Sequence, residues 1–186
     1  MMYSFRPVTP ADLSLVFDWL DTPHIQEFWD NSQAHRDDIA HFTKGRPSAS
    51  SYFNGMNHYW LGLHNLTPFS FIITHEENDT TDPPPYFRPY LAKEGLTIGL
   101  DFCIGAPAFI GKKMAASTLK AFMTFYVKDV APTTKTFLID PFLSNPRAVH
   151  VYEKAGFQKV CTFEQENGYF QGRKGILMTC TPSFSL

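Results

Sequence analysis

Cysteine is scarce in this chain of 186 residues: Cys103, Cys161 and Cys180 are the only three, and no two of them form a Cys-x-x-Cys pair. An odd number of widely spaced cysteines argues against a disulfide framework or a zinc site and predicts free thiols in a reducing compartment. The histidines show no metal-ligand spacing either, and His35 and His41, six positions apart, are predicted to lie on the surface of a helix. We therefore expect no bound metal.

Charge imbalance and long apolar runs are also missing. Lysine and arginine together number 16 and aspartate and glutamate 18, so the net charge of −2 provides no general attraction to nucleic acid or to an anionic membrane. No apolar run approaches the ~20 residues that span a bilayer, and the first residues lack the basic-then-apolar pattern of a signal peptide. We expect a cytoplasmic protein, monomeric or homodimeric, that binds neither nucleic acid nor a membrane.

What the chain does contain is a globular composition with a mixed succession of strands and helices. Hydrophobic residues make up 44% and aromatic residues 16% of it, which is enough to bury a core in one domain over residues 1–186. Periodicity and turn residues predict an α/β (or α+β) domain in which helices flank a mixed central sheet. The predicted strands are 3–8, 59–64, 69–75, 96–104, 136–139, 157–163 and 175–181, and the predicted helices are 9–20, 24–30, 37–42, 111–128 and 144–155. Residues 76–89 are acidic and proline-rich and are expected to form either a mobile excursion or a substrate-side loop.

The stretch 95–120 is the centre of this organisation. Its pattern predicts a strand, a loop of small residues and the start of a helix. Unpaired backbone N–H groups at the start of a helix bind anions, typically phosphate, and Lys112 and Lys113 add positive charge in the same turn. Asp101 is a lone carboxylate in an otherwise apolar strand, which marks it as a candidate for acid–base chemistry.

Two segments resemble motifs of the GNAT superfamily of acyl-CoA N-acyltransferases: SNPRAVHVYEKAGF at residues 144–157 and IGKKMA at residues 110–115. The second is similar to the family's pyrophosphate loop, with Ile110 and Lys113 standing where that loop usually has Arg or Gln and Gly. The stretches TPADLSLVFDWLDTPHIQEFW, GLDFCIGAPAFIGK and IDPFLSNPRAVHVYEKAGF further resemble aminoglycoside 6′-N-acetyltransferases and the lysine and hydroxylysine acyltransferases of siderophore synthesis. The resemblance covers most of the chain except residues 46–93.

This resemblance implies a GNAT-like fold, acetyl-CoA as acyl-donor co-substrate and a small-molecule amine as acceptor. An amine that attacks a thioester must lose a proton while the departing thiolate benefits from gaining one. Asp101 is the expected general base and Tyr152 the expected general acid, and an Asp at position 101 favours an aminoglycoside-like polyamine. The residues expected to hold the coenzyme are Cys103, Ile104, Ile110, Gly111, Lys112, Lys113, Met114, Ala115, Asn145, Ala148 and Lys154. Those expected near the acceptor are Trp29, Glu94 and Asp140.

Three alternatives to this function stay open at the level of sequence. The acceptor could be a lysine or hydroxylysine precursor of a siderophore. The departures at Ile110 and Lys113 are compatible with a CoA-binding module that lacks turnover. A protein N-acetyltransferase, with residues 76–90 as a peptide groove, is the third alternative.

Overall fold

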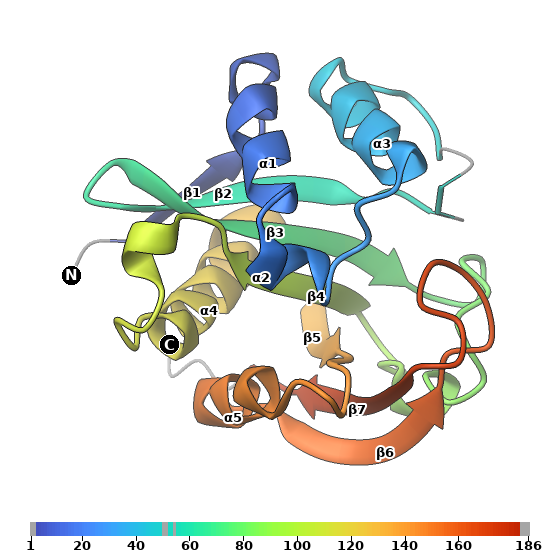
Figure 1. Cartoon of the computed structure of the whole chain (residues 1–186). Helices are drawn as coiled ribbons and strands as arrows, with labels where there is room; N and C mark the ends of the chain where they lie inside the picture. The colour runs from blue at the N-terminus through green and yellow to red at the C-terminus, as the bar shows by residue number, and fades with distance from the viewer. Residues whose placement is uncertain (1–2, 50–51, 54, 183–186) are drawn as a thin grey trace.

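Seven strands form one mixed sheet in the computed structural model, which describes residues 3–49, 52–53 and 55–182 (Figure 1). The strand order across the sheet is β1-β2-β3-β4-β5-β7-β6. The strands are β1 (Tyr3–Pro7), β2 (His58–His64), β3 (Thr67–Glu77), β4 (Leu96–Ile104), β5 (Thr134–Ile139), β6 (Gln158–Glu164) and β7 (Lys174–Cys180). The mixed central sheet predicted from the sequence is confirmed.

The first half of the sheet is an antiparallel meander from β1 to β4. Its hairpin between β2 and β3 is tighter than the sequence predicts, because Asn65 and Leu66 alone make the turn, with φ of 48° and 68°. Two consecutive positive φ values are typical of the two-residue turn that matches the twist of a hairpin. The chain then crosses from β4 to a parallel β5 through a helix, as a parallel connection requires.

Helices cover both faces of the sheet (Figure 1). One face carries α1 (Leu13–Leu20), α2 (Pro23–Gln26) and α3 (Gln33–Thr43), whose apolar residues pack with those of β2 and β3. The opposite face carries α4 (Ala115–Phe125) and α5 (Pro146–Ala155), which pack on Ile98, Leu100 and Phe102 of β4. Because side chains alternate along a strand, Gly99, Asp101 and Cys103 of β4 point to the face of α1, α2 and α3.

Several helix boundaries differ from the sequence-based expectation, and α2 ends at Gln26 rather than at residue 30. Helix α3 begins at Gln33 rather than near residue 37, because Ser32 caps it by accepting a hydrogen bond from the N–H of His35 at 3.3 Å. Helix α4 begins at Ala115 rather than at Gly111, because Gly111 and Lys113 have φ of +77° and +58°, which a right-handed helix excludes. A short 3-10 turn (η3, Pro107–Phe109) precedes this loop.

The acidic, proline-rich segment after β3 is anchored at its far end. The ring of Tyr86 stacks on Phe163 of β6 with centroids 4.3 Å apart, and Phe87 is buried with Leu138 and Leu177. A 3-10 turn (η2, Arg88–Tyr90) then leads to β4. No helix among the described residues is long and apolar enough to cross a membrane.

Candidate active site

The central parallel pair of strands separates part of the way along its length. Strand β4 pairs with β5 only from Leu96 to Gly99, the last pair being Gly99 with Leu138. The other edge of β4 stays paired with β3 as far as Ile104. Residues 100–104 therefore carry an edge that no described strand of the sheet covers, and the diverging strands leave a wedge between them. An extended ligand can pair with such an edge as an additional strand would.

Asp101 and Asp140 stand on the two sides of this wedge. If the parallel register continued past Gly99 and Leu138, these two carboxyl groups would lie opposite each other. Burial raises the pKa of Asp101, although the neighbouring His75 and His35 oppose the rise. Burial, together with the charge of Asp101, raises the pKa of Asp140 to about 8. The pair therefore retains a proton at neutral pH, because two neighbouring carboxylates resist full ionisation.

A histidine on β3 lies on the same face as Asp101. His75 pairs in register with Gly99, and its ring covers that glycine so closely that an added Cβ would lie 2.2 Å from His75 Nε2. The same Nε2 atom lies 3.0 Å from Oε1 of Glu77. Burial lowers the pKa of His75, but the hydrogen bond and charge of Glu77 outweigh it and raise this pKa overall.

His35 is a correction to the sequence analysis, which placed it on a helix surface. Its side chain is buried, with only 1% of the residue exposed, and stacks on Tyr52 with ring centroids 5.0 Å apart. Nδ1 lies 2.6 Å from the backbone oxygen of Asp30, whereas Nε2 has no hydrogen-bond partner among the described residues. Burial lowers the pKa of His35, so the ring is held neutral. Trp29, predicted near the acceptor, packs on Phe71 of β3 on this face at 5.4 Å.

Tyr152 lies on the opposite face of β4. It is 7% exposed, belongs to the core beneath α4 and α5, and its hydroxyl donates to the backbone oxygen of Phe102 at 3.4 Å. Burial, followed by the charge of Asp101, raises the pKa of Tyr152, so its hydroxyl keeps its proton. The structure thus places the predicted base and the predicted acid on either side of the uncovered edge of β4.

At the start of α5, Asn145, which was predicted to bind the coenzyme, caps the helix with its side chain. The side-chain oxygen of Asn145 accepts a hydrogen bond from the N–H of Ala148 at 3.1 Å and caps the helix. That oxygen is therefore engaged, and the side-chain NH₂ is the part of Asn145 left for a ligand. Lys154 lies exposed on the same helix.

The loop before α4 lies at the surface, and the N–H of Lys112 within it donates to the backbone oxygen of Phe109 at 3.4 Å. Gly111, Lys112 and Lys113 are exposed, and Ile110 is 40% exposed. Met114 is buried, and its oxygen accepts the N–H of Thr118 at the start of the helix. Ala115 begins the first turn, where N–H groups have no acceptor within the helix. Consecutive residues of opposite φ sign, such as Lys113 at +58° and Met114 at −87°, have the backbone geometry of nests that bind anions.

Two further predicted coenzyme residues form the end of β4. The side chain of Cys103 packs on the face of α1, and burial raises the pKa of its thiol, so this sulfur is an inert packing group. The oxygen of Ile104 lies 3.1 Å from Nε2 of His24. The backbone of these residues, rather than their side chains, lines the wedge.

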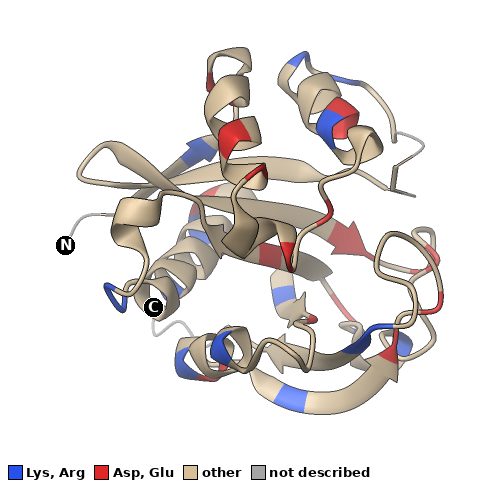
Figure 2. Ribbon diagram, in the orientation of Figure 1, with Lys and Arg blue, Asp and Glu red and all other residues tan. Residues whose placement is uncertain are grey.

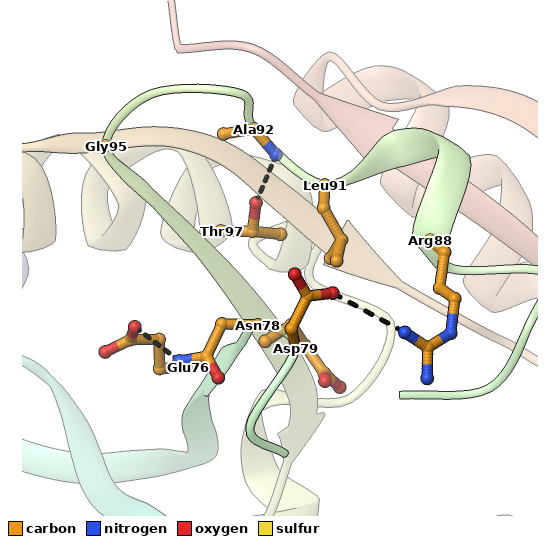
Figure 3. A pocket seen from close by; sticks show the side chains of 9 residues that line it. Glu76, Asn78, Asp79, Arg88, Leu91, Ala92, Gly95 and Thr97 are labelled. Atoms are coloured by element: carbon orange, nitrogen blue, oxygen red, sulfur yellow. Dashed lines mark hydrogen bonds and ion pairs between the residues drawn. The ribbon is translucent and has the colours of Figure 1, made fainter. Parts of the chain in front are cut away.

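Glu94 does not join the residues around Asp101. It is exposed in the turn before β4, and the six residues from Leu96 to Asp101 span ~16 Å of strand. A cavity of about 250 Å³ lies at this end of β4 instead. It is shown in Figure 3, and its lining residues are Glu76, Glu77, Asn78, Asp79, Arg88, Leu91, Ala92, Gly95 and Thr97. Its link to the site is Glu77, which lines the cavity and also bonds His75.

Sequence reasoning missed His75, Glu77 and His35. The available signal for the first two was their spacing, because positions 75 and 77 of one strand point to the same face. His35 had no comparable signal, since its burial depends on the packing of α3 against β2. Among the described residues, no group of three or more His, Cys, Asp or Glu side chains could hold a metal ion.

Known proteins are similar to this chain in sequence and in fold. A family model for the acetyltransferase (GNAT) domain matches residues 9–165. Aminoglycoside N(6′)-acetyltransferase type 1 of Klebsiella pneumoniae is 24% identical over 176 residues, which cover 89% of this chain and 78% of that protein. The crystal structure of the aminoglycoside N(6′)-acetyltransferase of Legionella pneumophila superposes with a TM-score of 0.71 at 25% identity, covering 97% of this chain and 94% of that one.

A third relative shares the fold and was crystallised with ligands. Aminoglycoside acetyltransferase AAC(6′)-Ib in complex with coenzyme A and kanamycin has a TM-score of 0.69 at 20% identity and covers 97% of this chain and 95% of that one. The domain match extends over most of the chain and includes the wedge, the loop before α4 and the start of α5. The chain therefore belongs to the GNAT acetyltransferase family.

Proposed function

We propose that this protein transfers an acetyl group from acetyl-CoA to a primary amine of a polycationic, aminoglycoside-like small molecule. The observation that carries the proposal is the wedge between β4 and β5, with Asp101 on one face of its uncovered edge and Tyr152 on the other. Relatives described as aminoglycoside N(6′)-acetyltransferases support the choice of acceptor.

The residues of the wedge fit the coenzyme. The N–H groups in the first turn of α4, which have no acceptor within the helix, and the ammonium groups of the exposed Lys112 and Lys113 suit a diphosphate, which accepts hydrogen bonds and carries negative charge. The backbone of Cys103 and Ile104 suits the two amides of a pantetheine arm, which pair with a free strand edge. Asn145 and Ala148 at the start of α5 and Lys154 border the same side of the sheet. The bound coenzyme supplies the acetyl thioester.

The acceptor side combines carboxylates with aromatic surfaces. In Figure 2, Asp and Glu occur on β3 and β4 at the centre of the sheet, whereas Lys and Arg occur on α5, on β6 and in the loop before α4. Asp140 and Glu77 accompany Asp101, and Trp29 offers a flat apolar face nearby. Negative charge on this side attracts a polycation and positive charge near α4 attracts a diphosphate, so the two substrates are sorted to opposite faces.

The proton transfers follow from this placement. Asp101 accepts a proton from the acceptor nitrogen, which makes the nitrogen lone pair available for attack. The apolar surroundings that raise the pKa of Asp101 make it a stronger base than an exposed aspartate. Tyr152 donates its hydroxyl proton to the departing sulfur, and its raised pKa ensures that the proton is present throughout the working range.

An amine panel tests the proposal by release of the free thiol from acetyl-CoA. Kanamycin-type amines should release thiol, and Asp101→Asn should lower kcat by about 10²–10⁴-fold while the thermal shift caused by CoA is retained. Release with lysine or hydroxylysine but with no aminoglycoside would replace the acceptor with a siderophore precursor. Binding of CoA without turnover of any amine or peptide would show a binding module, and release with peptides alone would show a protein N-acetyltransferase.

A further inference from the structure

A histidine that the sequence does not single out lies within the acceptor side of the site. His75 of β3 and Asp101 of β4 are diagonal neighbours on one face of the sheet, because His75 pairs with Gly99 and Ile73 pairs with Asp101. Side chains in diagonal positions of neighbouring strands come within reach when one of them is long or aromatic. Gly99 has no side chain, so the imidazole of His75 occupies the space above it.

Glu77 fixes the orientation and the tautomer of this imidazole. Oε1 of Glu77 lies 3.0 Å from Nε2 of His75, and an ionised carboxylate only accepts, so Nε2 carries the hydrogen. Glu77 is itself held, because its Oε2 accepts the hydroxyl of Thr81 at 3.1 Å. Nδ1 of neutral His75 then bears a lone pair, and this buried atom has no hydrogen-bond partner among the described residues. A carboxylate that fixes one imidazole nitrogen and leaves the other free for a proton is the arrangement found in general-base dyads.

The buried His35 likewise has its hydrogen fixed on one ring nitrogen and a lone pair free on the other. The backbone oxygen of Asp30 fixes the hydrogen of His35 on Nδ1, which leaves a lone pair on the unpartnered Nε2. Two buried imidazole nitrogens without partners therefore accompany the carboxylate of Asp101. Buried polar atoms are rarely left unpaired, so a ligand with N–H groups is the expected partner.

The chemistry of acetyl transfer needs more than one proton acceptor. A primary ammonium group loses two protons when its nitrogen becomes an amide, while the departing sulfur gains one and the remaining one leaves to solvent. Asp101 can accept the first, but it cannot accept the second until it has released the first. A second acceptor beside it removes this limitation.

We propose that His75, positioned by Glu77, accepts the second proton of the acceptor nitrogen through Nδ1 and passes it to solvent. This role rests on the proposed function. In the step, an N–H bond of the acceptor breaks, its proton forms a bond with Nδ1, and the electron pair stays on nitrogen. The other proton, accepted by Asp101, replaces the one that Tyr152 gives to sulfur, so protons balance over the cycle.

The groups that face His75 determine its pH dependence. Glu77 on the same strand, Asp101 of β4 and Asp140, which follows β5, favour its charged form. His58 of β2 lies close enough to interact with it, and burial lowers the pKa of His58. Phe53 packs on the imidazole at 4.6 Å and carries no charge. Removing the charge of Glu77 should therefore weaken His75 as a proton acceptor.

Kinetics of the full chain with acetyl-CoA and the best amine of the panel test this role. His75→Asn should lower kcat/KM for the amine by about 10²-fold and remove one ionisation from its acidic limb, with KM for acetyl-CoA unchanged. Glu77→Gln, which keeps an oxygen acceptor of the same shape, should move that ionisation to lower pH. His41→Asn, on the exposed side of α3, is the matched control and should leave both rate and profile unchanged.

Nitrogen NMR of the histidine rings gives a second readout that needs no turnover. The signal absent in His75→Asn should show hydrogen on Nε2 in the unaltered chain, and its titration should move to lower pH in Glu77→Gln. Hydrogen on Nδ1, or a His75→Asn variant with wild-type rate and pH profile, overturns the role of His75 alone. Failure of the unaltered chain to acetylate any amine defeats the proposed function and this role with it.

Discussion

Replacing Gly99 by alanine displaces the His75 ring without removing it. A Cβ at position 99 would lie 2.2 Å from Nε2, 2.7 Å from Cε1 and 2.8 Å from Cδ2 of His75, distances at which the ring must move. Moving it breaks the 3.0 Å contact between Nε2 and Glu77. A hydrogen bond to a charged group contributes ~1.5–3 kcal/mol to the free energy of unfolding.

The alanine also stabilises the strand backbone, which offsets part of this loss in the free energy of unfolding. Glycine within a strand is less stable than alanine by ~0.5–1 kcal/mol, because it loses more backbone freedom on folding. The net effect of Gly99→Ala is therefore a loss of about 1–2 kcal/mol. With a urea dependence of ~2 kcal/mol per molar, the unfolding midpoint should fall by about 0.5–1 M.

A double-mutant cycle separates the clash from other effects. In a His75→Ala chain the ring is absent, so Gly99→Ala should no longer destabilise and should raise the midpoint slightly. The kcat/KM of the Gly99→Ala variant for the amine should approach that of the His75→Asn variant, while the thermal shift caused by CoA is kept. Equal destabilisation by Gly99→Ala in both backgrounds would refute the reasoning, because the cost would then not come from His75.

Three other substitutions probe the remaining parts of the site. Asp101→Asn removes the charge that helps to raise the pKa of Asp140 to about 8, so the carbon NMR titration of the Asp140 carboxyl should move to lower pH; an unmoved midpoint would show that the two groups do not interact. Tyr152→Phe should lower kcat by about 10²-fold in thiol-release assays with little change in KM for acetyl-CoA, and a full rate would assign the proton donor elsewhere. Lys113→Gly should raise the free energy of unfolding by about 0.5–1 kcal/mol in urea, since Lys113 has φ of +58°; a lower value would mean that its side chain stabilises the loop.

Local patterns determined most of the secondary structure of this protein. The Thr9–Asp12 capping box at the start of the first helix, the Asn145 cap, and Gly156 with φ of +108° at the end of α5 were all readable from residue types at fixed spacings. The strand around Asp101 and the motif at 144–157 likewise revealed the family. These features depend on contacts between residues a few positions apart, which a sequence displays directly.

Tertiary structure alone decided which of these residues meet. The register of β4 with β5, which ends at Gly99 and Leu138, sets Asp101 and Asp140 on the two sides of the wedge, and the β3–β4 register brings His75 over Gly99; neither can be read from spacing along the chain. Lys113 stands where the family's pyrophosphate loop usually has Gly, and its backbone adopts the left-handed conformation that glycine takes most easily. The sequence by itself thus determined the elements and the family, whereas the pairing of strands decided the acid–base groups, because a strand's register fixes which distant side chains share a face.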